Sequence, residues 1–200
     1  MPVKSRQAQH SAATRAALIR AARKLFTERG YSATPTEEVV RRARVTRGAL
    51  YHHFRDKQDL FKAVFHEEQM KMAAAIKAAA AREADPWRAL IAGCHAFLDA
   101  CLDRAVQQIL LIDAPAVLGW AGCREADAMY YLEGVKALIQ AAIAQRIIAP
   151  QPVDALARLL LGALNEAAML IAHAGDEQAT RREVSEVVDK LLGGIRSGGK

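Results

Sequence analysis

The chain has 200 residues, enough for one or two domains with a buried core, and it carries a formal net charge of +6. Residues 1–57 hold 13 Lys and Arg against 4 Asp and Glu, whereas residues 58–200 hold 15 against 18. A basic N-terminal part on a mildly acidic remainder is typical of a nucleic-acid binder, with a solvated basic face as the alternative.

Composition and motifs disfavour several other classes of protein. The three cysteines form no Cys-x-x-Cys pair, which argues against a disulfide scaffold and a zinc site. The N-terminus has no apolar signal-peptide core, and no run approaches the roughly 18 apolar residues of a membrane span. Gly-rich phosphate loops, Gly-x-Ser-x-Gly and metal triads are missing, so we expect no catalytic residue, metal ion or cofactor. The expectation is a cytoplasmic protein with free thiols.

The first elements in chain order are a predicted arm and a predicted helix. Residues 1–12 are polar and basic, and we expect them to form a flexible arm. Apolar residues then recur at helical spacing, which predicts a helix near residues 14–29. Gly30 follows this pattern directly and is expected to end the helix.

Two short helices joined by a tight turn are predicted next. Thr34 is the expected N-cap of the first, Pro35 suits the first helical position, and Glu37 completes a capping box. Val45 marks the turn, and Thr46 can cap the second helix. This arrangement predicts a helix-turn-helix, a motif that binds DNA through its second helix.

The second short helix, over about residues 47–54, separates two kinds of side chain. Leu50 and Phe54 are four residues apart, so they share one face and are expected in the core. Arg47 and Tyr51 fall on other faces, where Arg suits guanine edges and Tyr suits phosphates. Gly48 allows the backbone to approach DNA closely. The alternative is a structural corner whose outer residues are ordinary surface residues.

The remaining elements are also predicted to be helical. Asp56 is expected to cap a fourth helix, to about residue 80, that joins the basic part to the rest of the chain. Further helices are expected near residues 86–103, 104–112, 124–146, 153–173 and 179–195, with the short one ending before Pro115. Because no convincing strand appears, the predicted fold class is all-α with about nine helices.

The last two predicted helices carry broad apolar stripes that favour a homodimer. Small residues in the stripes allow close approach, and two helices from each of two copies make a four-helix interface. Packing within one chain is the alternative. The residues predicted at the interface are Leu156, Leu160, Ala163, Ala167, Val184, Val188, Leu191, Leu192 and Ile195.

Aromatic and polar residues within the predicted body helices suggest an effector pocket. Asn165 interrupts an apolar helix and needs a partner, which a ligand, a neighbouring helix or water can provide. Core packing is the alternative for each aromatic and Cys residue, because pocket walls are mostly ordinary apolar side chains. The candidate lining residues are Trp87, Cys94, Phe97, Cys101, Trp120, Tyr130, Asn165, Met169 and His173. The expected effector is small and largely apolar.

The N-terminal part of the sequence resembles the tetracycline-repressor (TetR) family of bacterial transcription regulators. The resemblance runs over about residues 14–65 and depends on residues 21–31, on Leu-Tyr-His-His-Phe at 50–54 preceded by Arg-Gly-Ala, and on residues 56–60. It implies a three-helix DNA-binding head on an all-helical ligand-binding and dimerisation body. By position it implies base-edge contacts for Arg47 and Ala49, and phosphate contacts for Thr34, Thr36, Thr46, Tyr51, His52 and Lys57.

One position departs from the family's pattern. The family usually has Gly at the turn position that Arg44 fills here. A non-Gly residue at positive φ costs about 1 kcal/mol. Either the turn follows a different path, or Arg44 offsets the strain through a phosphate contact, and we favour the contact.

Together these features predict a ligand-responsive DNA-binding regulator, with a DNA-binding domain at residues 1–57 and an effector-binding and dimerisation domain at residues 58–200. The expected partners are double-stranded operator DNA, a second copy of the chain and an effector that releases a repressor from a palindromic operator. The same head also suits an activator or a helical interaction protein. A small enzyme using Cys94 with His95 or Glu166 is a further alternative, but adjacent residues on a helix point about 100° apart.

Overall fold

Helices make up the regular elements in the computed structural model, which describes residues 6–196. In chain order they are α1 (Arg6–Arg29), α2 (Thr36–Ala43), α3 (Arg47–His53), α4 (Lys57–Ala80), α5 (Pro86–Ala100), the π-helix η1 (Val106–Asp113), α6 (Ala114–Asp127), the π-helix η2 (Ala128–Leu132), α7 (Glu133–Ala144), α8 (Val153–Ala172) and α9 (Glu177–Gly194). Within the same range, an isolated antiparallel bridge joins Ile148 to Arg196. The predicted all-α class is confirmed.

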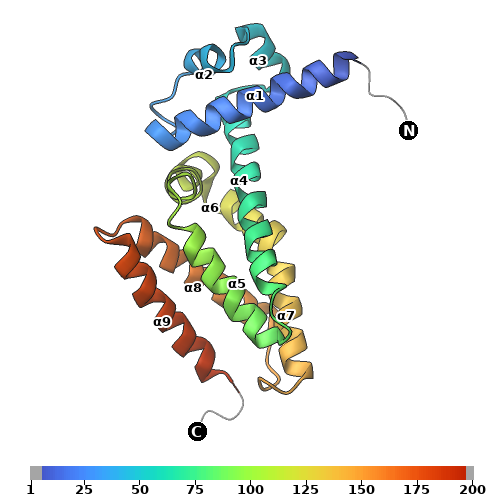
Figure 1. Cartoon of the computed structure of the whole chain (residues 1–200), viewed down its shortest axis with the longest axis vertical. Coiled ribbons are helices and arrows are strands. Elements are labelled where there is room, and N and C mark those ends of the chain that lie inside the picture. Colours follow the sequence, from blue (N-terminus) through green and yellow to red (C-terminus); the bar gives the residue numbers. More distant parts are fainter. Residues whose placement is uncertain (1–5, 197–200) are drawn as a thin grey trace.

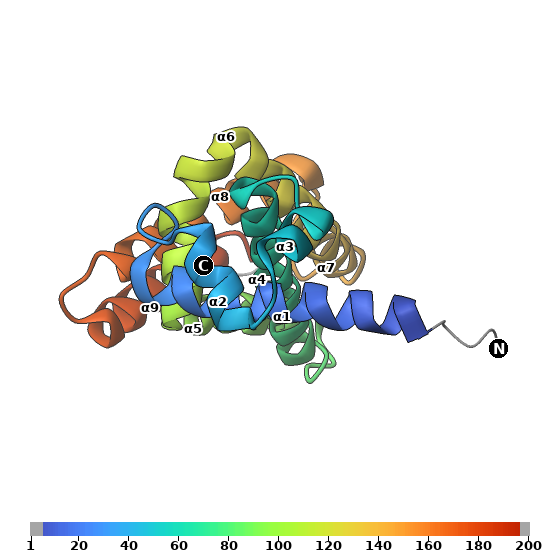
Figure 2. The ribbon, with the colours of Figure 1, turned by 90° about the horizontal axis from the view of Figure 1, so that it is seen from above.

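The elements form a head and a body connected by one long helix. Figure 1 shows α1, α2 and α3 at one end of an elongated molecule, with α4 running from this head into the body. In the body, α5 packs against α4, α7 and α9, and α8 packs against α7 and α9. Seen from above in Figure 2, the N-terminal half of α1 projects beyond the body. α4 is therefore the direct connection between head and body.

The predicted cap and core anchors of α3 are confirmed. The Thr46 hydroxyl accepts a hydrogen bond from the Ala49 backbone N–H at 3.1 Å, which satisfies one of the free donors of the first turn. Leu50 and Phe54 are both buried in the hydrophobic core, and α3 packs against α1 and α2. These contacts fix the rotation of α3 about its own axis, and thereby decide which residues point outward.

The predicted capping role of Thr34 is wrong. α2 begins at Thr36 with Pro35 at the N-cap, and no side chain caps it. Thr34 is fully buried, and its hydroxyl donates a hydrogen bond to the Gly30 carbonyl at 2.8 Å. The extended backbone of Pro35, with φ −77° and ψ 149°, moves the helix start beyond the reach of Thr34.

α1 is longer than predicted. It begins at Arg6, so residues 6–12 form helical turns and the predicted arm is wrong over this stretch. The alanines at positions 8, 12 and 13 favour this extension because Ala has the highest helix propensity. The rest of the predicted arm, residues 1–5, lies outside the described residues.

The connecting helix α4 follows the prediction closely. Asp56 caps it by accepting a hydrogen bond from the Asp59 backbone N–H at 2.7 Å. Its apolar side chains at helical spacing are buried, as expected for a helix with one face in the core. The buried residues of its first turns are Leu60, Phe61, Val64 and Phe65.

The chain between α5 and α8 is more continuous than predicted. η1 runs directly into α6 through Pro115, where a helix end was expected. Pro115 occupies one of the first two positions of α6, where a missing N–H costs little. The break lies instead inside α6 at Gly119, with φ 73° and ψ 168°. The two π-helical stretches flank this segment, and such geometry is frequent at functional sites.

The apolar side chains of α8 and α9 lie on two sides of these helices, one buried in the chain and one exposed. The predicted interface is corrected accordingly. One side packs inside the chain, and four residues predicted at the interface lie there: Leu160, Ala167, Val188 and Leu192. Three more, Leu156, Val184 and Ile195, are partly buried against the same core. The chain's own core therefore takes most of the residues that were assigned to a partner.

The other side of these two helices is exposed. Leu159 is 73% exposed and Leu170 is 52% exposed on α8, and Val187 and Leu191 on α9 are 54% and 62% exposed. Ala163 of α8 is also exposed. We call Leu159, Leu170, Val187 and Leu191 the α8–α9 face. Several exposed large apolar side chains on two helices that pack on each other favour an interaction site here.

Two helical stretches have the length and hydropathy of a membrane span, against the expectation from sequence. They are Val106–Ala144 and Val153–Ala172. Length and composition alone do not separate a spanning helix from a core helix of a soluble protein, and both stretches place side chains in the core. The first is also interrupted at Gly119.

Candidate nucleic-acid interface

α3 presents Arg47 and Tyr51 to the outside, next to its buried anchors. The Arg47 guanidinium lies 3.6 Å from the Glu37 carboxylate, and its central carbon lies 5.6 Å from the centre of the Tyr51 ring. Both partners of this ion pair are exposed, so the pair contributes little to stability. Arg47 can therefore exchange Glu37 for a base edge or phosphate at small cost.

The backbone of α3 is accessible at its second and third residues. A Cβ added at Gly48 would meet only the Thr46 hydroxyl, at 3.9 Å, so this side of the helix is open. Ala49 is half-buried and His52 is exposed. Burial and the nearby His52 and Arg15 lower the pKa of His53, which favours its neutral form.

Sequence reasoning missed the part that α1 contributes to this surface. A shallow hollow lies between α1 and α3 and is lined by Ala8, His10, Ser11, Thr14, Gly48, Ala49, His52 and His53. Ala8, His10 and Ser11 were assigned to an arm, so their position beside α3 was not considered. The available signal was the set of short polar side chains at 10, 11 and 14, which share one helical face.

The turn between α2 and α3 keeps the left-handed path despite the lack of glycine. Arg44 has φ 57° and ψ 43°, and its backbone N–H donates to the Arg41 carbonyl at 3.2 Å. The alternative that the turn follows a different path is therefore wrong. The Arg44 side chain is exposed at the end of α2. Its phosphate contact stays a prediction.

The three outer phosphate candidates have different surroundings. Thr34 is buried with its hydroxyl already donated, so its predicted phosphate contact is wrong. Thr36 is half-buried, and its hydroxyl lies 3.3 Å from the Glu37 carboxylate. The Lys57 ammonium lies 4.2 Å from the centre of the Tyr31 ring, and burial lowers its pKa although Asp113 opposes this. Contacts of Thr36 and Lys57 with DNA stay predictions.

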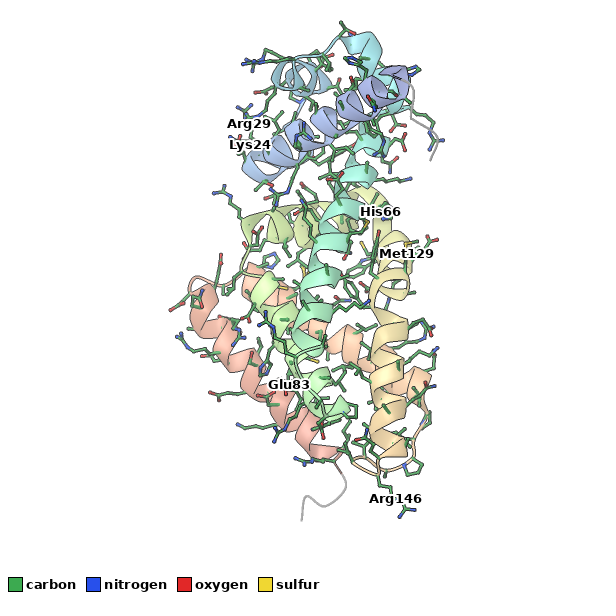
Figure 3. All side chains as sticks on the ribbon, turned by 45° about the vertical axis from the view of Figure 1, so that its right-hand side comes forward. Lys24, Arg29, His66, Glu83, Met129 and Arg146 are labelled. Atoms are coloured by element: carbon green, nitrogen blue, oxygen red, sulfur yellow. The ribbon has the colours of Figure 1, made fainter. Side chains whose placement is uncertain are left out.

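Several other basic residues of the head are paired with its own glutamates. Glu38 contacts Arg29 at 2.7 Å and Arg41 at 3.2 Å, and Glu28 contacts Arg42 at 3.8 Å. Figure 3 shows Lys24 and Arg29 at the C-terminal end of α1. These pairs reduce the free positive charge there and leave α3 and the turn as the strongest candidate contact surface.

The body contains a cavity of about 170 Å³ between α4, α5, η1, α6, η2 and α8. Four of the predicted pocket residues line it: Phe97, Trp120, Asn165 and Met169. Sequence reasoning missed Gln69, Arg124 and Asp127, which also line it. That an effector binds these residues stays a prediction.

A second cavity, of about 790 Å³, lies between α4, α5 and α7 and shares Phe97 and Tyr131 with the first. The predicted residues Cys94 and Tyr130 line this second cavity. Trp87, Cys101 and His173 line neither cavity. Trp87 and Cys101 are core residues, and His173 is exposed with a ring nitrogen 2.8 Å from the Met169 carbonyl. Neither cavity supports a pocket role for these three residues, and that role stays a prediction.

Polar contacts join the head and the first turn of α4 to the segment formed by η1 and α6. The Tyr31 backbone N–H donates to the Asp113 carboxylate at 2.8 Å, and the Gln58 amide donates to the Val117 carbonyl at 2.7 Å. Burial raises the pKa of Asp113, although the hydrogen bond from Tyr31 opposes this. The same segment lines the 170 Å³ cavity, so it touches both the head and the cavity.

The chemistry of the cysteines does not favour a nucleophile. Burial raises the pKa of the Cys94 thiol to about 12, and of the Cys101 thiol to about 12, which disfavours the reactive thiolate. His95 directs its ring nitrogen to Asp189 at 2.8 Å. Among the described residues, no group of three or more His, Cys, Asp and Glu side chains is placed to hold a metal ion.

Two family descriptions match most of the chain. Residues 18–64 match "Bacterial regulatory proteins, tetR family", and residues 87–195 match "Tetracyclin repressor-like, C-terminal domain". The first match contains the helix-turn-helix of α2 and α3. The second contains the helices of the body from α5 to α9.

Individual relatives agree with these matches. The Transposon Tn10 TetC protein of Escherichia coli is 29% identical over 162 residues, which cover 81% of this chain and 82% of that protein. The HTH-type transcriptional regulator AcrR of Shigella flexneri is 42% identical over 57 residues, or 28% of this chain and 26% of that protein. A crystal structure of a TetR-family transcriptional regulator from Pectobacterium atrosepticum is 35% identical, covers 98% of this chain and 100% of that chain, and superposes with a TM-score of 0.86. The chain therefore belongs to the TetR family and is a ligand-responsive, DNA-binding transcriptional regulator.

Proposed function

We propose that the protein is a homodimeric repressor that holds a palindromic operator until a small effector binds in the body. The observation that carries the DNA-binding part is the exposed side of α3, with Arg47, Gly48 and Tyr51 outward while Leu50 and Phe54 are buried. A capped helix in this setting enters the major groove with base edges and phosphates within reach.

A gel shift with the DNA upstream of the protein's own gene, repeated across a salt series, tests this proposal. We expect binding that survives excess competitor DNA and weakens steeply as salt rises, because phosphate contacts release counterions. Equal affinity for unrelated sequences would contradict an operator-specific regulator and favour an interaction protein. A reporter gene behind the bound DNA then distinguishes a repressor from an activator.

The α8–α9 face supports a second copy of the chain as partner. Its four exposed apolar residues belong to two helices that pack on each other, and pairing about a twofold axis covers them in a four-helix interface. A dimer also suits operator recognition, since two heads about 34–36 Å apart reach half-sites one helical turn apart.

The segment from η1 to α6 supports the role of an effector. Leu110, Leu111 and Pro115 line the 170 Å³ cavity. Asp113 accepts a hydrogen bond from the head, and Val117 accepts one from the first turn of α4. A ligand that favours one position of this segment therefore biases the position of the head. A coupling free energy of about 1–3 kcal/mol is typical of such an effect.

We propose that residues 1–57 form the DNA-binding domain and that residues 58–200 form the effector-binding and dimerisation domain. α4 begins at Lys57, so the boundary falls in the first turn of the connecting helix. A regulator of cytoplasmic DNA must itself be cytoplasmic, and this is the proposed location.

Replacing Arg47 by Ala is expected to cost about 1–3 kcal/mol of operator binding and to relax specificity at one position in each half-site. Tyr51→Phe removes a phosphate donor and is expected to weaken all sequences alike. Gel shifts against a set of single-base operator variants measure both effects. The same loss on every sequence for both variants would contradict the assignment of Arg47 to a base edge.

Arg44→Gly separates backbone strain from a phosphate contact. Gly suits the left-handed backbone at φ 57°, so the fold should be retained or slightly stabilised. If Arg44 contacts phosphate, operator affinity falls uniformly and the slope of log Kd against log salt decreases by about one unit. An unchanged slope would reject the contact.

A further inference from the structure

The smaller of the two body cavities, which Asp127 and Asn165 line, has a volume of about 170 Å³, and this volume limits what it can hold. A dry cavity of about 150 Å³ holds one benzene ring. The apolar part of the wall is aromatic and thioether-rich and consists of Phe65, Met72, Phe97, Leu110, Leu111, Pro115, Trp120, Tyr131 and Met169. This space therefore suits a single aromatic ring with a short substituent.

The charged groups that line the cavity are unequal in number and in burial. They are Arg124, Asp127 and Glu166, so two are acidic and one is basic. Arg124 and Glu166 are exposed at the edge, whereas Asp127 is half-buried. The least exposed of the three charged groups is therefore the acidic Asp127.

Asp127 is held in position by its neighbour on α8. The Asn165 amide donates a hydrogen bond to one Asp127 carboxylate oxygen at 2.8 Å. Burial raises the pKa of Asp127, while Asn165 and Arg124 oppose this. One amide is a weak partner for a desolvated carboxylate, because buried charges are stable only when paired or well hydrogen-bonded. A cation in the cavity would complete its environment.

Tyr131 and Gln69, which also line the cavity, already form a hydrogen bond with each other. The Tyr131 hydroxyl donates a hydrogen bond to the Gln69 side-chain carbonyl, and both residues are buried. This pair fixes the Tyr131 ring as part of the cavity wall. Aromatic faces of this kind attract cations electrostatically as well as packing against rings.

We propose, resting on the function proposed above, that the effector is a small arylalkyl amine with a single aromatic ring, in its cationic ammonium form. Its ammonium group pairs with Asp127, and its ring lies against Phe65, Phe97 and Tyr131. An anionic ligand would meet the repulsion of Asp127 and Glu166. A neutral ligand of the same shape would leave Asp127 with only the Asn165 amide and the exposed Arg124 to stabilise its charge.

Three probes of nearly equal size test the charge preference: benzylamine, benzyl alcohol and benzoate. Titration calorimetry on the whole protein without DNA, at neutral pH, should give benzylamine an affinity at least about tenfold above benzyl alcohol. Benzoate should bind more weakly than either. Equal affinities for the amine and the alcohol, or no binding of any probe at millimolar concentration, would overturn the proposal.

Asp127→Asn is the matching variant, because Asn keeps the shape and can still accept a hydrogen bond from Asn165. It should lower benzylamine affinity at least about tenfold and leave benzyl alcohol within about twofold. Glu125→Gln removes an exposed charge from the same helix, at a residue that lines neither cavity, and should change both affinities by less than about threefold, because exposed charges are well screened. An amine-to-alcohol ratio unchanged by Asp127→Asn would also overturn the proposal.

Gel shifts separate a failure of this inference from a failure of the proposed function. If the protein binds its operator but benzylamine shows no preference in the cavity, only the ligand class is wrong. If the protein does not bind operator DNA specifically, the proposed function is wrong whatever the cavity binds. A fall in operator affinity as benzylamine is added is the expected result.

Discussion

A Leu191→Glu protein is expected to be a folded monomer that has lost most of its affinity for operator DNA. Leu191 is 62% exposed on the α8–α9 face, so a carboxylate there costs the isolated chain little. In the proposed dimer the same carboxylate is desolvated between apolar surfaces, which is costly. Because a linked pair of heads gains about 10²–10⁴ in affinity over one head, operator affinity should fall at least about a hundredfold.

Arg182→Glu is the matched control for this prediction. Arg182 is exposed on α9 and lies nine residues before Leu191, which places it on the opposite side of the helix. It introduces the same residue into the same helix, outside the proposed contact. Analytical ultracentrifugation and gel shifts should show a DNA-binding dimer for Arg182→Glu and a weakly binding monomer for Leu191→Glu. A Leu191→Glu protein that remains a dimer would place the interface elsewhere.

The α8–α9 face also marks the limit of what periodicity predicts. The apolar residues of α9 form a broad stripe that contains both Val187 and Val188, and the predicted interface included Val188 but not Val187. The structure buries Val188 in the chain and exposes Val187, although they are adjacent. An apolar residue in a helical stripe predicts that the residue is buried. It does not tell whether the residue packs within its own chain or against another copy.

Local features were predictable because their causes are local. The caps formed by Thr46 and Asp56 depend on residues within one turn, and both are confirmed. Thr34 also fitted the local pattern of an N-cap. In the structure, however, its side chain is buried and its hydroxyl donates a hydrogen bond to the Gly30 carbonyl. A local rule fails where tertiary contacts offer the polar group a competing hydrogen bond.

The cavity required contacts that no single stretch of sequence contains. Asn165 stood out because a polar residue interrupts an apolar helix, and it does line the cavity. Asp127 gave no such signal, since acidic residues are common on helix surfaces. Its contact with Asn165 joins α6 to α8 across a sequence separation of 38 residues, which no local pattern predicts.

Replacing Arg23 by Met is expected to lower the free energy of unfolding by about 2–3 kcal/mol at pH 7. Glu68 on α4 is 3% exposed and receives two hydrogen bonds from the Arg23 guanidinium of α1, at 2.7 and 2.9 Å. Met keeps the apolar stem of Arg but leaves the buried carboxylate with Lys71 alone, at 2.6 Å. The remaining lysine keeps the loss below the range of about 3–5 kcal/mol for a charge left without any partner.

The pH dependence of this loss distinguishes an ion pair from simple packing. Burial tends to raise the pKa of Glu68, but the hydrogen bonds from Arg23 and Lys71 outweigh it and hold the pKa below its ordinary value. A carboxyl with a depressed folded pKa adds stability above its unfolded pKa, about 4.3, and loses this contribution as pH falls through the folded value. Urea titrations should therefore show a large difference between the wild type and Arg23→Met at pH 7 that shrinks below about pH 4.

Lys24→Met supplies the control, because Lys24 is exposed and its nearest carboxylate, on Glu28, is 3.9 Å away. Lys24→Met should lower the free energy of unfolding by less than about 0.5 kcal/mol at both pH 7 and pH 3. A difference for Arg23→Met that is equally large at pH 7 and pH 3 would mean that packing of the side chain, not its charge, holds α1 to α4. A difference that shrinks at low pH would instead show that the Arg23–Glu68 ion pair holds α1 of the head to α4. The same helix α4 contributes Phe65, Gln69 and Met72 to the wall of the 170 Å³ cavity.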